Sequence, residues 1–93
     1  MIKSFDCKET RKIFERVFSN KFPPEIQRAA YRKLLMLEVS TSLNDLRYPP
    51  GNRLEKLTGE LEGRLSLRIN KQWRLIFVWN QGNAYKVKIT DYH

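Results

Sequence analysis

The hydrophobic pattern of this chain changes its period near Asn52, and this change constrains the fold more than any other feature. Before Asn52, apolar residues recur every three or four positions, as on one face of an α-helix. After Asn52, they alternate with polar residues, as in a strand with one buried face. The pattern predicts an α+β fold with two N-terminal helices packed on one face of a small, twisted, mainly antiparallel sheet.

Two helices are expected in the first half. Apolar spacing predicts a short amphipathic helix between Asp6 and Phe18, with Ile13, Phe14, Val17 and Phe18 on its apolar side. A proline pair then ends this helix and begins another, because proline is tolerated in the first turn of a helix. The second helix is expected from Pro24 to about Val39, with an apolar stripe formed by Ile26, Ala30, Leu34 and Leu37.

Three or four strands are expected in the second half, joined by turns at 70–72 and 80–83. The segment 73–79 is apolar on both faces except for Arg74, which is typical of a central strand. In its two neighbouring segments, 64–69 and 84–92, apolar and polar residues alternate. Their inward residues are expected to be Leu65, Leu67 and Ile69, and Tyr85, Val87 and Ile89. With one turn at 43–46, a loop at 47–52 and no repeat, residues 1–93 are expected to form a single domain.

Composition excludes several classes of protein. One cysteine (Cys7) and one histidine (His93) supply neither a disulfide framework nor a tetrahedral zinc site. No apolar run approaches the roughly 20 residues that cross a bilayer, and no signal peptide or nucleotide-cofactor motif is present. We expect a cytoplasmic protein without a membrane, metal or cofactor association, in which Cys7 is a buried or idle thiol.

The net charge of +8 points to an anionic partner. The half up to residue 46 contributes +3 and the rest +5, so the excess lies on the sheet half. A basic sheet face with the aromatic residues Tyr48, Trp73 and Tyr92 nearby suits RNA, although a solvated surface remains the alternative. The candidate RNA-binding residues are Arg53, Lys56, Arg64, Lys71, Trp73, Lys86 and Lys88, together with Arg68 and Arg74.

Arg74 is the most informative single residue, because it places a guanidinium in an otherwise apolar strand. Arginine tolerates a half-buried site when it binds a phosphate or carboxylate in a bidentate manner. The alternative is an internal ion pair with Glu55 or Asp91. Arg68 is less specific, since it can also be an edge charge that blocks aggregation.

The C-terminal residues bring an acid, a phenol and an imidazole together. Cleavage of RNA by its own 2′-hydroxyl needs a base, an acid and cations on the phosphate oxygens. His93, Tyr92, Arg68 and Arg74 supply these groups without a metal. Asp91 either orients His93 or forms a simple salt bridge with a lysine.

Several segments together resemble the HigB toxins of bacterial type II toxin-antitoxin systems, within the RelE/ParE superfamily. They are Ile2–Phe5, Pro49–Gly59, Ser66–Leu75 and Asp91–His93. The most specific are the Ile-Asn-x-Gln-Trp-Arg hairpin and the Asp-Tyr-His terminus.

The resemblance implies a RelE-like fold and a ribosome-dependent endonuclease. Such a toxin cuts mRNA in the A site without a metal, through attack by the 2′-hydroxyl. Arg74 then matches the family's phosphate-binding arginine, and Asp91, Tyr92 and His93 match its C-terminal active-site residues. Glu55 stands where some members have a histidine, and Thr58 where they have a lysine. Glu55 is therefore a candidate base, or catalysis rests more on the arginines and the ribosome.

The resemblance also implies partners: the ribosome with its mRNA, and a HigA-like helix-turn-helix antitoxin through which the complex binds promoter DNA. Two other functions remain open. One is a ParE-like inhibitor of DNA gyrase, which does not need Arg74 and the Asp-Tyr-His terminus. The other is a non-catalytic nucleic-acid-binding module, whose binding would be sensitive to salt.

Overall fold

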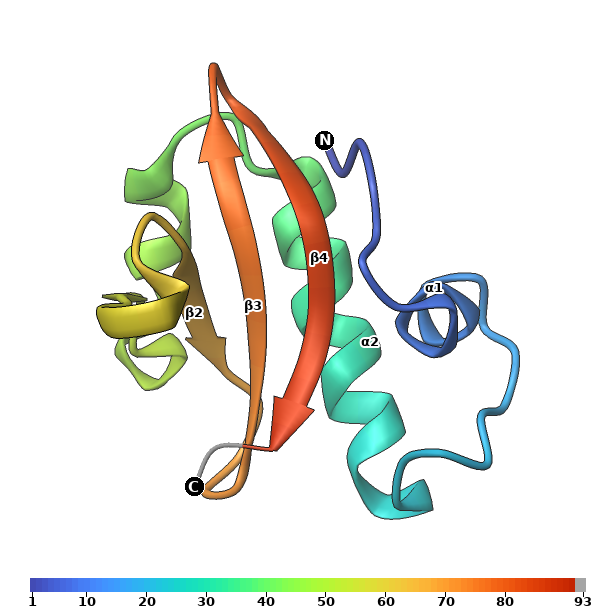
Figure 1. Cartoon of the computed structure of the whole chain (residues 1–93). Helices are drawn as coiled ribbons and strands as arrows, with labels where there is room; N and C mark the ends of the chain where they lie inside the picture. The colour runs from blue at the N-terminus through green and yellow to red at the C-terminus, as the bar shows by residue number, and fades with distance from the viewer. Residues whose placement is uncertain (92–93) are drawn as a thin grey trace.

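The computed structural model describes residues 1–91, which form two α-helices beside a four-stranded antiparallel sheet (Figure 1). The strands follow one another in the order β1-β2-β3-β4. The helices are α1 (Lys8–Phe14) and α2 (Pro24–Val39), and the strands are β1 (Glu55–Lys56), β2 (Leu65–Arg68), β3 (Trp73–Asn80) and β4 (Asn83–Asp91). Three short 3-10 turns are η1 (Leu43–Arg47), η2 (Pro50–Asn52) and η3 (Gly59–Leu61). The predicted α+β fold is confirmed, with β3 as the predicted central strand.

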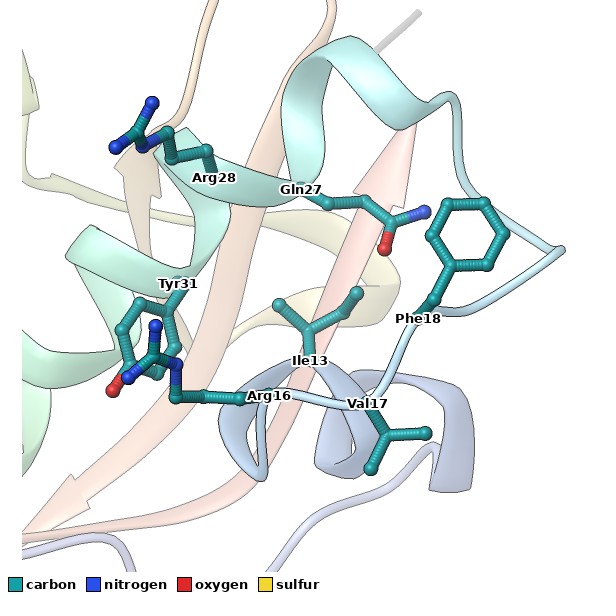
Figure 2. Close-up of a pocket in the computed structure, with 7 residues that line it drawn as sticks. All are labelled: Ile13, Arg16, Val17, Phe18, Gln27, Arg28 and Tyr31. Carbon is teal, nitrogen blue, oxygen red and sulfur yellow. The ribbon is translucent and has the colours of Figure 1, made fainter.

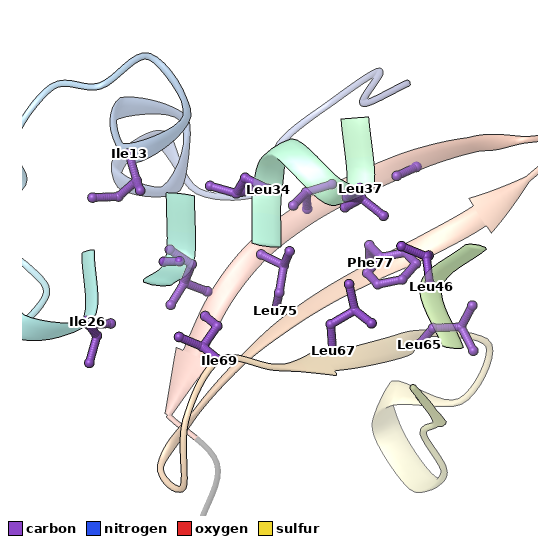
Figure 3. Packing of buried hydrophobic residues seen from close by; sticks show 14 of the residues in the cluster. Ile13, Ile26, Leu34, Leu37, Leu46, Leu65, Leu67, Ile69, Leu75 and Phe77 are labelled. Atoms are coloured by element: carbon purple, nitrogen blue, oxygen red, sulfur yellow. The ribbon is translucent and has the colours of Figure 1, made fainter. Parts of the chain in front are cut away.

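The core lies between α2 and one face of the sheet. α2 crosses behind β4 in Figure 1, and its Leu34 and Leu37 are fully buried. Figure 3 shows these two leucines above Leu75 and Phe77 of β3. Burial of each such side chain is worth about 1.5–3 kcal/mol, so this layer supplies much of the stability. We call the helix-covered face of the sheet the inner face and the opposite one the outer face.

The N-terminal segment and α1 cover the edge of β4. The segment runs parallel to β4, with bridges between Ile2 and Ala84 and between Phe5 and Val87. Farther along, the buried hydroxyl of Thr10 in α1 accepts a hydrogen bond of 2.9 Å from the backbone N–H of Ile89. An exposed strand edge invites pairing with other chains, so these contacts protect β4.

α1 is shorter than predicted, and Val17 and Phe18, expected on its apolar side, lie beyond its end and are exposed. The helix ends at Phe14, and Arg16 takes a positive φ of 63°. Polar contacts hold the following loop near the helices: Ser19 Oγ donates to Glu9 (2.6 Å), and Gln27 Nε2 donates to the Ser19 carbonyl (2.7 Å). Apolar periodicity does not encode such contacts between segments distant in sequence.

The predicted inward position of Tyr85 is also wrong. A bulge interrupts the pairing of β3 with β4 between Ile76 and Val78, and Lys86 has a positive φ of 55°. An extra residue changes the phase of side-chain alternation. Ala84 and Val87, three positions apart, therefore both face the core, while Tyr85 is half-buried.

We expect Leu34→Ala to lower the free energy of unfolding by about 2–5 kcal/mol, because the substitution leaves a cavity in the core. Leu35→Ala is the matched control: its side chain is 40% exposed, and the loss should be under about 1 kcal/mol. Urea unfolding followed by circular dichroism measures both. Equal losses for the two variants would contradict the assigned buried face of α2.

Candidate functional site

The outer face of the sheet brings four predicted site residues together. Residues directly opposite one another on paired strands share a face. Arg68 lies opposite Arg74, which lies opposite Thr90. The next row on the same face begins two residues farther along β3. In this row Glu55 lies opposite Ser66, Ser66 opposite Ile76, and Ile76 opposite Lys88. We call Glu55, Arg68, Arg74 and Lys88 the Arg74 cluster.

Arg74 is buried at 6% exposure and is held by two partners from the segment before β2. Its Nη2 donates a 2.7 Å hydrogen bond to the Arg53 carbonyl, and its Nη1 lies 3.3 Å from Glu55 Oε1. The internal ion pair with Glu55 foreseen as an alternative is therefore present. A buried charge needs such partners, and they fix the plane of the guanidinium. The Glu55 side chain is 49% exposed, so the pair opens toward solvent.

Arg68 is held beside Arg74 by the turn of the hairpin. Its Nε donates a 3.2 Å hydrogen bond to the Asn70 carbonyl. The Asn70 side chain in turn accepts hydrogen bonds of 2.8 Å from the backbone N–H groups of Gln72 and Trp73. This Asx-type turn explains the Asn-Lys-Gln sequence and keeps two guanidinium groups on one row of the outer face.

Asn52 positions the segment that holds Arg74, although no sequence motif marks it as a site residue. Its side chain is fully buried, and its Nδ2 donates to the carbonyls of Leu46 (3.1 Å) and Tyr48 (3.0 Å). The Lys33 ammonium of α2 donates to its Oδ1. Burial lowers the pKa of Lys33. The signal available in the sequence was an asparagine in a Pro-Pro-Gly-Asn turn, which also suits an exposed loop.

Arg64 crosses the outer face and is held away from the Arg74 cluster. It precedes β2 on the outward side of the alternation, yet its Nη1 lies 3.3 Å from Asp6 Oδ2. Asp6 lies beyond β4, because its backbone N–H bonds to the Val87 carbonyl. The pair therefore spans from the start of β2, past β3 and β4, to the N-terminal segment at the margin of the outer face.

Four other predicted RNA-binding residues lie apart from the cluster. Lys56 is opposite Leu65 and belongs to the inner-face side, where it is exposed. Trp73 is half-buried and packs edge-on against Phe22, with ring centroids 5.7 Å apart. Lys71 is exposed in the hairpin turn, and Lys86 is exposed at the bulge. The roles of these residues stay predictions.

The C-terminal site residues are described only as far as Asp91. Asp91 lies opposite Trp73 at the end of β4, and its Oδ2 accepts a 3.0 Å hydrogen bond from Gln72 Nε2. Tyr92 and His93 lie outside the described residues. Their predicted acid and base roles, and the orienting role of Asp91, stay predictions.

Beside the end of β4 is an open cavity of about 610 Å³, whose lining includes Cys7, Lys21, Lys88 and Asp91. Burial raises the pKa of the Cys7 thiol. Hydrogen bonds from Thr10 and Glu9 and the Lys21 ammonium outweigh that effect, so the pKa lies below its ordinary value. Lys88 lines this cavity and also faces the outer side, so the cavity adjoins the Arg74 cluster.

The Arg74 cluster contains the kinds of group that anion binding and proton transfer need. Two guanidinium groups and an ammonium supply cations for phosphate oxygens, and an exposed carboxylate stands beside them. Within residues 1–91, no group of three or more His, Cys, Asp or Glu side chains is arranged to hold a metal ion. Within the same residues, no helix is long and apolar enough to span a membrane.

A family model described as the RelE-like toxin of type II toxin-antitoxin system HigB matches residues 3–93. Toxin HigB-1 of Vibrio cholerae is 52% identical over 62 residues, which is 67% of this chain and 65% of that protein. An uncharacterized protein of Haemophilus influenzae is 43% identical over 65 residues, or 70% and 64% of the two chains. The match thus spans just under two thirds of either relative. Endoribonuclease HigB of Proteus vulgaris is 29% identical over 93 residues, the full length of both proteins.

Solved structures share the fold. A YafQ mutant from E. coli superposes with a TM-score of 0.64 at 13% identity, covering 98% of this chain and 91% of that one. The YoeB dimer from Staphylococcus aureus superposes with a TM-score of 0.59 at 22% identity, covering 99% of this chain and 94% of that one. The YoeB-YefM complex from the same organism superposes with a TM-score of 0.56 at 20% identity, covering 100% of this chain and 95% of that one. At these identities, the likeness concerns the fold alone.

We expect Asn52→Ala to lower the free energy of unfolding by about 1–3 kcal/mol, because buried carbonyls and the Lys33 ammonium lose their partner. Amide hydrogen exchange at residues 53–56 should become faster. Asn44→Ala, at an exposed asparagine of η1, is the control and should change neither property. Unchanged exchange at 53–56 in a destabilised Asn52→Ala protein would show that Asn52 does not position this segment.

Proposed function

Because the chain belongs to the HigB family of RelE-like toxins from type II toxin-antitoxin systems, we propose that it is an endoribonuclease that arrests growth by cutting translated mRNA. We propose further that it works in the cytoplasm on mRNA in the ribosomal A site and needs no metal. The name of the full-length relative, Endoribonuclease HigB, supports the reaction class.

The observation that carries the proposal is the buried Arg74 guanidinium on the outer face. It is oriented by Glu55 and the Arg53 carbonyl and lies opposite Arg68. Such an arrangement is suited to a phosphate whose negative charge increases in the transition state. Lys88 adds a third cation on the same face. Together they supply the electrostatic stabilisation that a metal ion gives in other nucleases.

The proposed reaction is attack by the RNA's 2′-hydroxyl on the adjacent phosphorus. The P–O bond to the 5′-oxygen breaks, leaving a 2′,3′-cyclic phosphate and a 5′-hydroxyl. A base takes the proton of the 2′-hydroxyl, and an acid protonates the departing oxygen. Glu55 and His93 are the candidate bases, and Tyr92 and His93 are the candidate acids. Arg68 and Arg74 would bind the non-bridging oxygens, and Asp91 would orient His93.

The remaining basic residues would contact RNA outside the reacting phosphate. Arg53, Lys71 and Lys86 are exposed, and Lys56 extends the positive surface to the inner-face side. Arg64 would contribute after release from Asp6, and Trp73 through its half-buried ring. The partners we propose are the ribosome, the mRNA and a HigA-like helix-turn-helix antitoxin, which would link the toxin to promoter DNA.

We expect Arg74→Ala and Arg68→Ala to reduce cleavage about 10²–10³-fold each, because each substitution removes a cation from the developing negative charge. Arg47→Ala, at an exposed arginine of η1, is the control. Mapping of 5′ ends in total mRNA after brief induction measures cleavage, and circular dichroism verifies the fold. New ends inside reading frames should disappear when translation is blocked. Intact mRNA in growth-arrested cells would overturn the proposal and direct the next assay to gyrase.

Glu55→Gln and deletion of His93 distinguish the two candidate bases. Gln keeps the size of Glu55 but cannot accept the proton, so a loss of about 10²-fold or more is expected if Glu55 is the base. Deletion of His93 should cause that loss if the imidazole is the base or the acid. Single-turnover cleavage of ribosome-bound mRNA measures both variants. Full activity of both variants would contradict acid-base catalysis by either residue.

A further inference from the structure

The helix layer carries a cleft that the cleavage mechanism does not use. It lies between the C-terminal end of α1 and the first turns of α2, and its volume is about 280 Å³ (Figure 2). Figure 2 shows Ile13 at its centre, with Tyr31 on one side and Phe18 on the other. The lining consists of Ile13, Arg16, Val17, Phe18, Gln27, Arg28 and Tyr31.

The C-terminal cap of α1 exposes the apolar rim of this cleft. Arg16, with its φ of 63°, ends α1 as a Schellman-type cap: its N–H donates to the Ile13 carbonyl (3.0 Å), and the Val17 N–H donates to the Lys12 carbonyl (2.8 Å). Val17 and Phe18 are consequently 50% and 60% exposed. Two adjacent large apolar side chains exposed beside a cleft point to a binding role.

The charge of the cleft specifies the chemistry of its occupant. The Arg16 guanidinium lies over the Tyr31 ring, 5.3 Å from its centroid, and so stays at the rim. Arg28 lines the same cleft from α2. The described lining includes no carboxylate. An apolar floor with two guanidinium groups therefore fits a segment that combines a bulky apolar side chain with carboxylates.

The size and place of the cleft indicate a protein segment. Pockets for drug-sized ligands usually begin at about 300 Å³, so this open cleft suits a single large side chain. It belongs to the helices that cover the inner face, whereas the Arg74 cluster lies on the outer face. A segment bound here leaves the Arg74 cluster uncovered.

We propose that this cleft is the docking site for an acidic segment of the antitoxin. A bulky apolar side chain of that segment would pack on Ile13 between Phe18 and Tyr31. Its carboxylates would pair with Arg16 and Arg28. The proposal rests on the proposed function, from which it takes the antitoxin as partner.

The test separates toxicity from neutralisation. Phe18→Ser and Arg28→Glu alter the cleft, while Val39→Ser and Lys3→Glu make matched changes at exposed positions outside it. Each variant is induced alone and together with its cognate antitoxin, and calorimetry measures the affinity of the purified pair. The cleft variants should stay toxic, bind the antitoxin at least tenfold more weakly and escape neutralisation. The two controls should be neutralised as the unaltered chain is.

A charge reversal makes the test stricter. Each Asp or Glu of the antitoxin is replaced singly by Arg. One of these antitoxin variants should bind the Arg28→Glu toxin with restored affinity and should bind the unaltered toxin more weakly. Failure of every exchange would overturn the pairing with Arg28. Neutralisation of both cleft variants at unchanged affinity would overturn the docking site.

Other occupants would give other results. Folded cleft variants that lose toxicity would assign the cleft to the toxin's target. Sedimentation showing a dimer that Phe18→Ser dissolves would assign it to a second copy of this chain. Either result would overturn the proposal. Failure of the proposed function is distinct: the unaltered toxin would leave mRNA intact, while the affinities for the antitoxin would still decide the docking site.

Discussion

The packing of α2 on the inner face of the sheet sets the plan of the molecule. Leu34 and Leu37 bury their side chains against Leu75 and Phe77, and the opposite face of β3 carries Arg74. The same helix carries Lys33, which binds Asn52 and anchors the loop before β1. α2 thus both closes the core and fixes the segment that supplies Glu55 and the Arg53 carbonyl.

The partners that burial of Arg74 requires also orient its guanidinium for the phosphate contact that we propose. A guanidinium at 6% exposure must be paired, and Glu55 together with a backbone carbonyl satisfies that need. These contacts restrict the rotamers of Arg74 before any ligand binds, so less conformational entropy is lost on binding. The half-exposed carboxylate beside it is the base that we propose as one of two candidates.

In the function we propose, the outer face of the sheet binds RNA and the helix layer binds the antitoxin. The outer face gathers cations on a rigid sheet, which suits precise contacts with a phosphate. The helix layer exposes Val17 and Phe18 beside Arg16 and Arg28, which suits a protein segment. Because the two surfaces belong to opposite sides of the sheet, substitutions can test each task separately.

The sequence by itself determined the fold class, the central strand and the presence of one charge, Arg74, within that strand, because these features depend on near neighbours in the chain. It also indicated the family through motifs spread along the chain. The tertiary structure alone decided the end of α1, the inward position of Ala84, the Asp6–Arg64 pair and the buried role of Asn52. Each of these depends on contacts between segments distant in sequence, or on a bulge that shifts alternation by one residue, and a local pattern records neither.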